Sequence, residues 1–303
     1  MTKSFAYLAA AAAIAGHAQA SKCYAIAFGS GDQSASYQSG ALAGLVQGMA
    51  PTDIAYTAVS GVAGGAVNAA ILASFPPGSE VNAADRMKTF WDNSGNNALY
   101  KDWPGGVTEG LLFKGGLYND KPLLNFLASE MADIAPAQRY VDVGLTDVLS
   151  GMYTNYYASD LVGQELIDVM YGSFSYAGFF APEAAMNSDF FSGATIENLD
   201  VFSVVNKCLE THLPEDIVVD VLLTNARTLK HVNAEKFKSM EMVWRFLHVA
   251  QYYNVMDGLL RAQFAYPTIN FRHIISPTGD LPDTRMPMVS ILYSHKLLEL
   301  DAS

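Results

Sequence analysis

The chain has 303 residues, of which half are hydrophobic and only 16% are charged, so it can bury a large core. This composition excludes an intrinsically disordered protein, because disordered chains are poor in apolar residues and rich in charge. The formal net charge of −12 argues against nucleic acid and anionic membrane surfaces as partners, since acidic residues outnumber Lys and Arg.

The N-terminal stretch MTKSFAYLAAAAAIAGHAQA has the layout of a secretory signal peptide. Lys3 precedes an apolar run from Phe5 to Gly16 that is too short to span a bilayer, and Ala18-Gln19-Ala20 offers small residues for cleavage. A buried alanine-rich helix is the alternative. We expect residues 1–20 to be a signal peptide and the mature protein to be secreted or to lie in the endomembrane lumen. No later stretch of the sequence is long enough for a transmembrane helix.

Short apolar runs rich in branched residues alternate with helical patterns along the mature chain. The segment Tyr37–Met49 has apolar residues at helical spacing, and an alanine-rich helix is predicted at Ala66–Phe75. Strands that alternate with helices predict a mostly parallel sheet covered on both faces, which is a three-layer α/β/α sandwich. The predicted strands are Tyr24–Phe28, Ile54–Val59, Tyr140–Leu145, Ile217–Leu223 and Ile269–Ile275.

Two further segments complete the predicted organisation. Residues 76–118 contain two tryptophans, paired glycines and several asparagines, which predict a loop-rich insertion beside the sheet with one helix near Ala83–Trp91. From Ala234 to Ala262, apolar residues recur at helical spacing and predict a long helix with one face on the core. Because we find no internal repeat and no low-complexity linker, we expect residues 21–303 to form a single domain.

The segment TAVSGVAGGAVNAAILA, from Thr57 to Ala73, reads as a strand, a sharp glycine turn and a helix. In hydrolases a Gly-x-Ser-x-Gly turn exposes a nucleophile at the N-terminus of a helix, where backbone amides stabilise an oxyanion. Gly61, Gly64 and Gly65 provide such a turn here. Its central position is Ala63, which has no atom that could attack a carbonyl carbon.

This elbow resembles that of patatin-like phospholipases, which are acyl hydrolases that cleave lipid esters with a serine–aspartate dyad. The segment AFGSGDQSASYQSGALAGL is similar to the family's glycine-rich oxyanion loop and the helix that follows it. Ser30 and Ser34 stand there where glycines are usual. The segment FFSGATIENLDVFSVVNKCLE is similar to the family's third motif, in which Gly193 and Ala194 match. The oxyanion-loop positions of this sequence are Gly29, Ser30, Gly31 and Asp32.

The resemblance implies a patatin-like fold that lacks both halves of the dyad. The position of the catalytic aspartate is occupied by Ser192, and a serine hydroxyl is a poor base at neutral pH. Loss of the serine nucleophile alone costs on the order of 10⁶ in turnover in a comparable hydrolase. We therefore expect a divergent, secreted member of the family that has lost hydrolysis, with a lipid-binding or interaction role. A neutral or zwitterionic lipid or an acyl chain is the expected partner, and a protein partner is a further possibility.

Two alternatives remain open at this point. The chain could be an active lipid acyl hydrolase that uses water or displaced residues, with Asp189, Asp200 or Asp257 as the candidate base. It could also be an engineered variant in which only the nucleophile was removed. That explanation predicts an otherwise intact site, whereas Ser192 and the oxyanion loop also depart from the family pattern.

The remaining candidate features carry less information. The two cysteines, Cys23 and Cys208, could form a disulfide in an oxidising compartment or remain free. The histidines of the mature chain are not paired at metal-ligand spacing, so we expect neither a metal nor a cofactor. The Phe- and Tyr-rich segment Tyr171–Pro182 could line an acyl groove, and ordinary core packing is the alternative.

Overall fold

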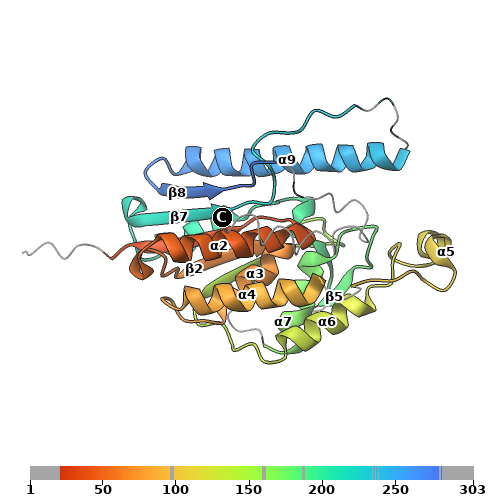
Figure 1. The fold of residues 1–303 in the computed structure, drawn as a ribbon, viewed down its shortest axis with the longest axis horizontal. Coiled ribbons are helices and arrows are strands. Elements are labelled where there is room, and N and C mark those ends of the chain that lie inside the picture. The colour runs from red at the N-terminus through yellow and green to blue at the C-terminus, as the bar shows by residue number, and fades with distance from the viewer. Residues whose placement is uncertain are drawn as a thin grey trace, which may run out of the picture.

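The structure, a computed structural model, describes residues 21–95, 99–158, 162–185, 188–233, 235, 237, 239–279 and 281. The expected signal peptide therefore lies outside the described residues. The chain forms a mixed α/β fold with a mostly parallel central sheet and helices on both faces (Figure 1). This arrangement confirms the three-layer α/β/α fold predicted from the alternation of strands and helices.

The sheet has eight strands in the order β5-β6-β3-β2-β1-β7-β8, and β4 pairs with β3. The carboxyl ends of the parallel strands lie along one edge, where open α/β sheets usually bind their ligands. The parallel strands are β1 (Cys23–Phe28), β2 (Ala58–Val62), β3 (Tyr140–Asp147), β7 (Ile217–Leu222) and β8 (Asn270–Ile275). The antiparallel strands are β4 (Tyr153–Tyr157), β5 (Glu183–Ala185) and β6 (Ser188–Ser192).

The helices form two layers with separate cores. One core lies under the larger helix layer, and the other lies under α8 and α9. Every residue of α3 is buried, and its alanines and glycines let it sit between the sheet and the neighbouring helices. The larger layer contains α2 (Ser36–Gly48), α3 (Gly64–Ala73), α4 (Glu80–Gly95), α6 (Lys121–Met131) and α7 (Gln164–Phe174). The other layer contains α8 (Val201–Leu209) and α9 (Ser239–Ala265), while α5 (Gly106–Phe113) projects away from the sheet (Figure 1).

The strand predicted at Ile54–Val59 is displaced along the chain. It begins at Ala58 and continues to Val62, directly into the elbow. Ile54 and Tyr56 are buried side chains of the core that precedes the strand, so their apolar character reflects burial and not strand pairing. The backbone amide of Tyr56 donates to the Glu80 carboxylate at 3.2 Å and so has a partner outside the sheet.

The segment 76–118 differs from the predicted loop-rich insertion. Its first helix, α4, extends beyond Ala83–Trp91 in both directions and belongs to the main core. Met87, Phe90 and Trp91 are buried there against the neighbouring helices. The part that projects from the sheet begins only after α4 and contains the second helix, α5.

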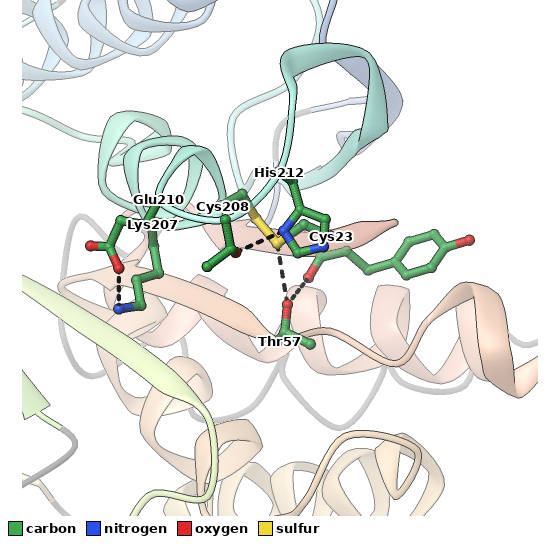
Figure 2. Close-up of a disulfide and its surroundings, with 8 residues drawn as sticks. Cys23, Thr57, Lys207, Cys208, Glu210 and His212 are labelled. Atoms are coloured by element: carbon green, nitrogen blue, oxygen red, sulfur yellow. Dashed lines mark hydrogen bonds and ion pairs between the residues drawn. A yellow bond between two sulfur atoms is a disulfide. The ribbon is translucent and has the colours of Figure 1, made fainter. Parts of the chain in front are cut away.

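A disulfide joins Cys23 at the start of β1 to Cys208 in α8 (Figure 2). It therefore links the sheet to the helix layer that covers one of its faces. Thr57 Oγ1 lies 3.3 Å from Cys23 Sγ, at the start of the neighbouring strand. Among the described residues, no helix is long and apolar enough to cross a bilayer.

Removal of the disulfide should destabilise the protein without changing its fold. The bond closes a loop across a sequence separation of 185 residues, so it restricts the unfolded chain strongly. We expect the double substitution Cys23→Ala/Cys208→Ala to lower the free energy of unfolding by about 2–5 kcal/mol. Chemical denaturation of both proteins under non-reducing conditions measures this difference. An unchanged free energy of unfolding would show that the disulfide does not stabilise the fold.

Candidate functional site

The elbow lies at the carboxyl end of β2, where Ala63 connects the strand to α3. Ala63 has φ 53° and ψ −125°, and it is the only non-glycine residue with positive φ in the described chain. This conformation costs an ordinary residue roughly 1–3 kcal/mol, and a strained residue of this kind is typical of nucleophile elbows. The backbone therefore has the geometry that would present a nucleophile, although the side chain is a methyl group.

Glycines allow the close backbone contacts that this turn requires. A Cβ atom on Gly61 would collide with the carbonyl group of Gly65. A Cβ atom on Gly65 would lie 2.5 Å from the carbonyl oxygen of Gly29 in the oxyanion loop. Gly64 and Gly65 form the first turn of α3, so any larger residue at position 65 would separate the loop from the helix.

Ser173, in the last turn of α7, holds the elbow in place. The Ala63 amide donates to Ser173 Oγ at 2.9 Å, and the Ser173 hydroxyl donates to the carbonyl oxygen of Gly144 in β3 at 2.7 Å. Ala63 is only 1% exposed and Ser173 is fully buried. The role of Ser173 could not be predicted from the sequence, because this hydrogen bond joins residues 110 positions apart and no local pattern indicates it.

Ser192, at the aspartate position of the third motif, ends strand β6. It lies opposite Leu145 of β3, and directly opposed residues of an antiparallel pair project to the same face of the sheet. Leu145 belongs to the core beneath the larger helix layer, so Ser192 lies on the face that α3 covers. Ser192 Oγ accepts a hydrogen bond from the Ala194 amide at 3.3 Å, and the residue is buried.

The elbow and the third motif meet at one backbone carbonyl. A Cβ atom on Gly193 would lie 2.5 Å from the carbonyl oxygen of Gly144, which is also the acceptor for Ser173. Ser173 in turn binds the amide of Ala63. The structure thus links the elbow, at residue 63, to the start of the third motif, at residues 192 and 193, through Ser173 and Gly144.

The first amides of the oxyanion loop are already used by the fold. Gly29 donates to the Leu222 carbonyl at 2.9 Å, and the Ser30 amide donates to the Asn198 carbonyl at 2.7 Å. The buried Ser30 hydroxyl also donates to Asn198 Oδ1 at 2.6 Å. An oxyanion would therefore have to be held by amides from Gly31 onward. Asp32, the last predicted loop position, begins a 3-10 turn that leads into α2.

A chain of buried amide groups fixes the loop against the helices. Gln38 Nε2 donates to the Gly29 carbonyl at 2.7 Å, and Asn68 Nδ2 donates to Gln38 Oε1 at 2.9 Å. Trp91 Nε1 donates to Asn68 Oδ1 at 2.8 Å. Such satisfied buried networks define a single arrangement, so the loop, α3 and α4 are held in fixed positions.

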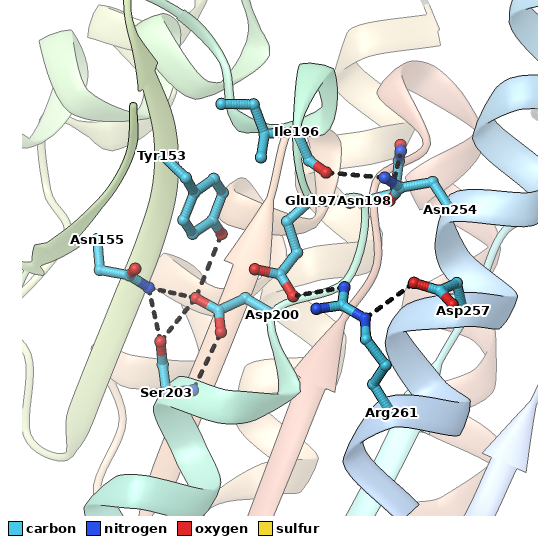
Figure 3. Close-up of polar contacts among 10 residues, drawn as sticks. All are labelled: Tyr153, Asn155, Ile196, Glu197, Asn198, Asp200, Ser203, Asn254, Asp257 and Arg261. Atoms are coloured by element: carbon cyan, nitrogen blue, oxygen red, sulfur yellow. Dashed lines mark hydrogen bonds and ion pairs between the residues drawn. The ribbon is translucent and has the colours of Figure 1, made fainter. Parts of the chain in front are cut away.

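The three carboxylates considered as displaced bases lie away from the elbow. Asp200 caps α8, where its carboxylate accepts from the Ser203 amide at 3.0 Å and the Ser203 hydroxyl at 2.7 Å (Figure 3). Asp189 is three residues before Ser192 in β6, so strand alternation directs it to the opposite face. Asp257 lies on α9 and pairs with Arg261 at 2.8 Å, as Figure 3 shows.

A second polar cluster lies on the face of the sheet covered by α8 and α9. Asp142 of β3 is 4% exposed and accepts from the Tyr140 hydroxyl at 2.8 Å. Burial, followed by the nearby charge of Asp200, raises the pKa of Asp142 to about 7. Burial and Asp200 also raise the pKa of Glu197 to about 7, while Arg261 opposes this rise. Two carboxyl groups of this cluster therefore bind protons near neutral pH.

The remaining sequence candidates are placed as follows. Tyr171 and Phe174, in the Phe- and Tyr-rich segment, belong to α7 and are buried in the core, and Phe180 packs against the same core. This part of the segment is core packing and does not line a groove. Among the described residues, the structure contains no group of three or more His, Cys, Asp or Glu that could hold a metal ion.

The comparison with protein-family models agrees with the resemblance seen in the sequence. The model of the patatin-like phospholipase family matches residues 26–205, a range that includes the oxyanion loop, the elbow and the third motif. The crystal structure of VipD from Legionella pneumophila aligns with a TM-score of 0.41 and 13% sequence identity, over 92% of this chain and 67% of that chain. No curated protein matches this sequence.

Replacement of Ala63 by glycine tests the strain at the elbow. The change removes backbone strain of roughly 1–3 kcal/mol. It also costs about 1–2 kcal/mol, because a buried methyl group is lost and the unfolded chain gains conformational entropy. We expect the free energy of unfolding to stay constant or to rise by about 1 kcal/mol. The control is Ala43→Gly in helix α2, which has ordinary helical geometry. Its free energy of unfolding should fall by about 1 kcal/mol. Equal losses in the two variants, measured by chemical denaturation, would contradict a strained elbow.

The raised pKa values predict that stability depends on pH. Unfolded carboxyl groups lose their protons near pH 4, whereas Asp142 and Glu197 keep theirs up to about pH 7 in the folded state. The folded protein therefore binds more protons between these values, and the free energy of unfolding should fall as the pH rises from 5 to 8. Denaturation curves recorded across this range measure the slope.

The substitution Asp142→Asn tests how much one of these two groups contributes to the pH dependence. The amide keeps an acceptor for the Tyr140 hydroxyl but cannot ionise, so the pH slope should flatten. The free energy of unfolding at pH 8 should rise by about 1–2 kcal/mol. Asp257→Asn, at an exposed carboxylate on α9, is the control and should follow the wild-type slope. A wild-type slope in Asp142→Asn would show that Asp142 is ionised throughout this range.

Proposed function

Because this chain belongs to the patatin-like phospholipase family, we propose that it is a lipid-recognising member that does not hydrolyse esters. One observation carries the proposal. Ala63, at the turn of the elbow, supplies a methyl group where the family resemblance implies the nucleophile, and Ser192, at the start of the third motif, supplies a hydroxyl group where it implies the base. The architecture of the reaction site is present, but its nucleophile and its base are not.

The absence of a serine nucleophile at residue 63 would remove a large part of the transition-state stabilisation needed for ester hydrolysis. A loss on the order of 10⁶ in turnover corresponds to about 8 kcal/mol of transition-state stabilisation. Ser173 contacts the elbow but does not replace the missing nucleophile. Its hydroxyl donates to the Gly144 carbonyl, and a carbonyl oxygen is too weak a base to take the proton of a nucleophilic hydroxyl. The amides of Gly29 and Ser30 donate to carbonyl groups of the fold and cannot stabilise an oxyanion.

Lipid recognition is the function that this family fold supports without a dyad. The net charge of −12 favours a neutral or zwitterionic lipid or an acyl chain over an anionic one. A secreted or lumenal location is part of the proposal. The Cys23–Cys208 disulfide supports it, because such bonds persist in oxidising compartments.

Restoring the dyad tests the catalytic part of the proposal. We expect wild-type protein to hydrolyse a p-nitrophenyl acyl ester and phosphatidylcholine no faster than the heat-denatured protein. The double substitution Ala63→Ser/Ser192→Asp should raise turnover at least tenfold above either single substitution, because nucleophile and base act as a unit. Wild-type turnover well above the denatured control, unaffected by changes at these two positions, would support hydrolysis through displaced residues instead.

Binding of a soluble acyl chain tests the recognition part separately. We expect folded wild-type protein to bind a fluorescent fatty acid below its critical micelle concentration, with an increase in fluorescence that unlabelled fatty acid reverses. If folded protein gave no such signal, lipid recognition would be the wrong function even if hydrolysis were absent.

A further inference from the structure

Large apolar side chains are exposed at scattered positions of the described chain, such as Leu213 and Phe264, and several more are concentrated on three segments. A typical soluble protein exposes such residues singly, and a concentration of them marks an interaction surface. Six of them are between 63% and 79% exposed: Leu111, Leu112 and Phe113 in α5, Leu149 and Met152 in the turn between β3 and β4, and Phe246 in α9.

These three segments lie at the carboxyl edge of the sheet, where the elbow is. The turn that carries Leu149 directly follows the carboxyl end of β3. Helix α9 follows β7 and runs back against the parallel strands, so it begins at the same edge (Figure 1). With 27 residues it is about 40 Å long, roughly twice the length of a six-residue strand, so its first half extends beyond the sheet.

Helix α5 is held at this edge by the loop that follows α7. The Leu117 amide donates to the Gly178 carbonyl and the Tyr118 amide to the Phe179 carbonyl, both at 3.0 Å. The last turn of α7 also contains Ser173, which binds the elbow. In Figure 1, α5 and the first residues of α9 both lie at the right, toward which the parallel strands point.

The charge around these side chains indicates the chemistry of the partner. Residues 99–121, which include α5, contain three basic and three acidic side chains, and residues 148–152 contain none. Residues 239–250 of α9 contain Glu241 and Arg245. These three segments therefore carry no net charge, in a chain whose net charge is −12. A surface without net charge, such as a layer of zwitterionic headgroups, matches them.

The shape of the edge also favours lipid over protein. The exposed apolar side chains belong to three separate elements, which are the end of α5, the turn between β3 and β4, and the first half of α9. A protein partner requires a complementary packed surface, whereas a fluid bilayer accommodates separate apolar projections at the boundary of its headgroups and acyl chains.

We propose that this edge, formed by α5, the β3–β4 turn and the first half of α9, docks on the surface of a zwitterionic phospholipid bilayer. The choice of lipid as ligand rests on the proposed function, but docking itself requires no lipid inside the site. Docking directs the elbow toward the bilayer, because Ala63 lies at the same edge. The site would then receive an acyl chain directly from the membrane.

Vesicle flotation with matched substitutions tests this docking. Wild-type protein should float with phosphatidylcholine vesicles. Phe113→Glu should weaken its partitioning at least tenfold, because a charge replaces the exposed aromatic ring that would insert into the bilayer. Phe264→Glu is the control. Phe264 is 83% exposed in the last turn of α9, near the amino ends of the strands. Its replacement by glutamate makes the same change of side chain and charge as Phe113→Glu. We expect it to partition within about twofold of wild type.

Other outcomes would overturn the proposal. Failure of the wild type to float, or equal weakening by Phe113→Glu and Phe264→Glu, would show that this edge is not the docking surface. A wild-type dimer in light scattering that Phe113→Glu dissociates would assign the edge to a second copy of the chain instead. Circular dichroism confirms that each variant is folded. Binding of the soluble fatty acid without flotation would leave the proposed function standing and reject only the docking surface.

Discussion

The left-handed backbone at residue 63 is the constraint on which the site depends. The chain must leave a buried strand and enter a fully buried helix within one residue, and it does so at φ 53°. This reversal brings the start of α3 against the oxyanion loop, where Gly65 has no room for a side chain. The hydrogen bond from the Ala63 amide to Ser173 opposes the cost of this conformation. Residue 63 thereby fixes the loop, the helix and α7 relative to one another.

None of these interactions needs a hydroxyl group at position 63 or a carboxylate at position 192. The turn requires a small side chain at residue 63 and an amide that can donate to Ser173, and alanine provides both. Ser192 similarly satisfies the Ala194 amide through its hydroxyl, as a capping residue. The fold of the elbow and of the third motif therefore places no chemical requirement on the side chains at positions 63 and 192 beyond their small size and the hydrogen bond to the Ala194 amide.

The elements that depend on local pattern could be predicted from the sequence. Four of the five parallel strands are largely buried and β8 is partly buried, and the glycine turn with its alanine-rich helix has a clear signature. Strands β4 to β6 were missed, because a segment such as Tyr153–Tyr157 is polar, partly exposed and becomes a strand only by pairing with β3. The same reason applies to Ser173 and Asp142, whose roles arise from residues distant in sequence.

Helix α9 connects the apolar edge to the interior of the site. Phe246 is exposed in its first half, and Gln251 follows five residues later, where its amide donates to Ser30 Oγ at 3.1 Å. One turn further, Asn254 Oδ1 accepts from the Asn198 amide at 2.9 Å (Figure 3). Because one continuous helix makes these contacts, a shift of its first half relative to the sheet must also move partners of the oxyanion loop and the third motif. The serine at position 30 thus has a structural role that a glycine could not fill, since it supplies the hydroxyl that binds both Asn198 and α9.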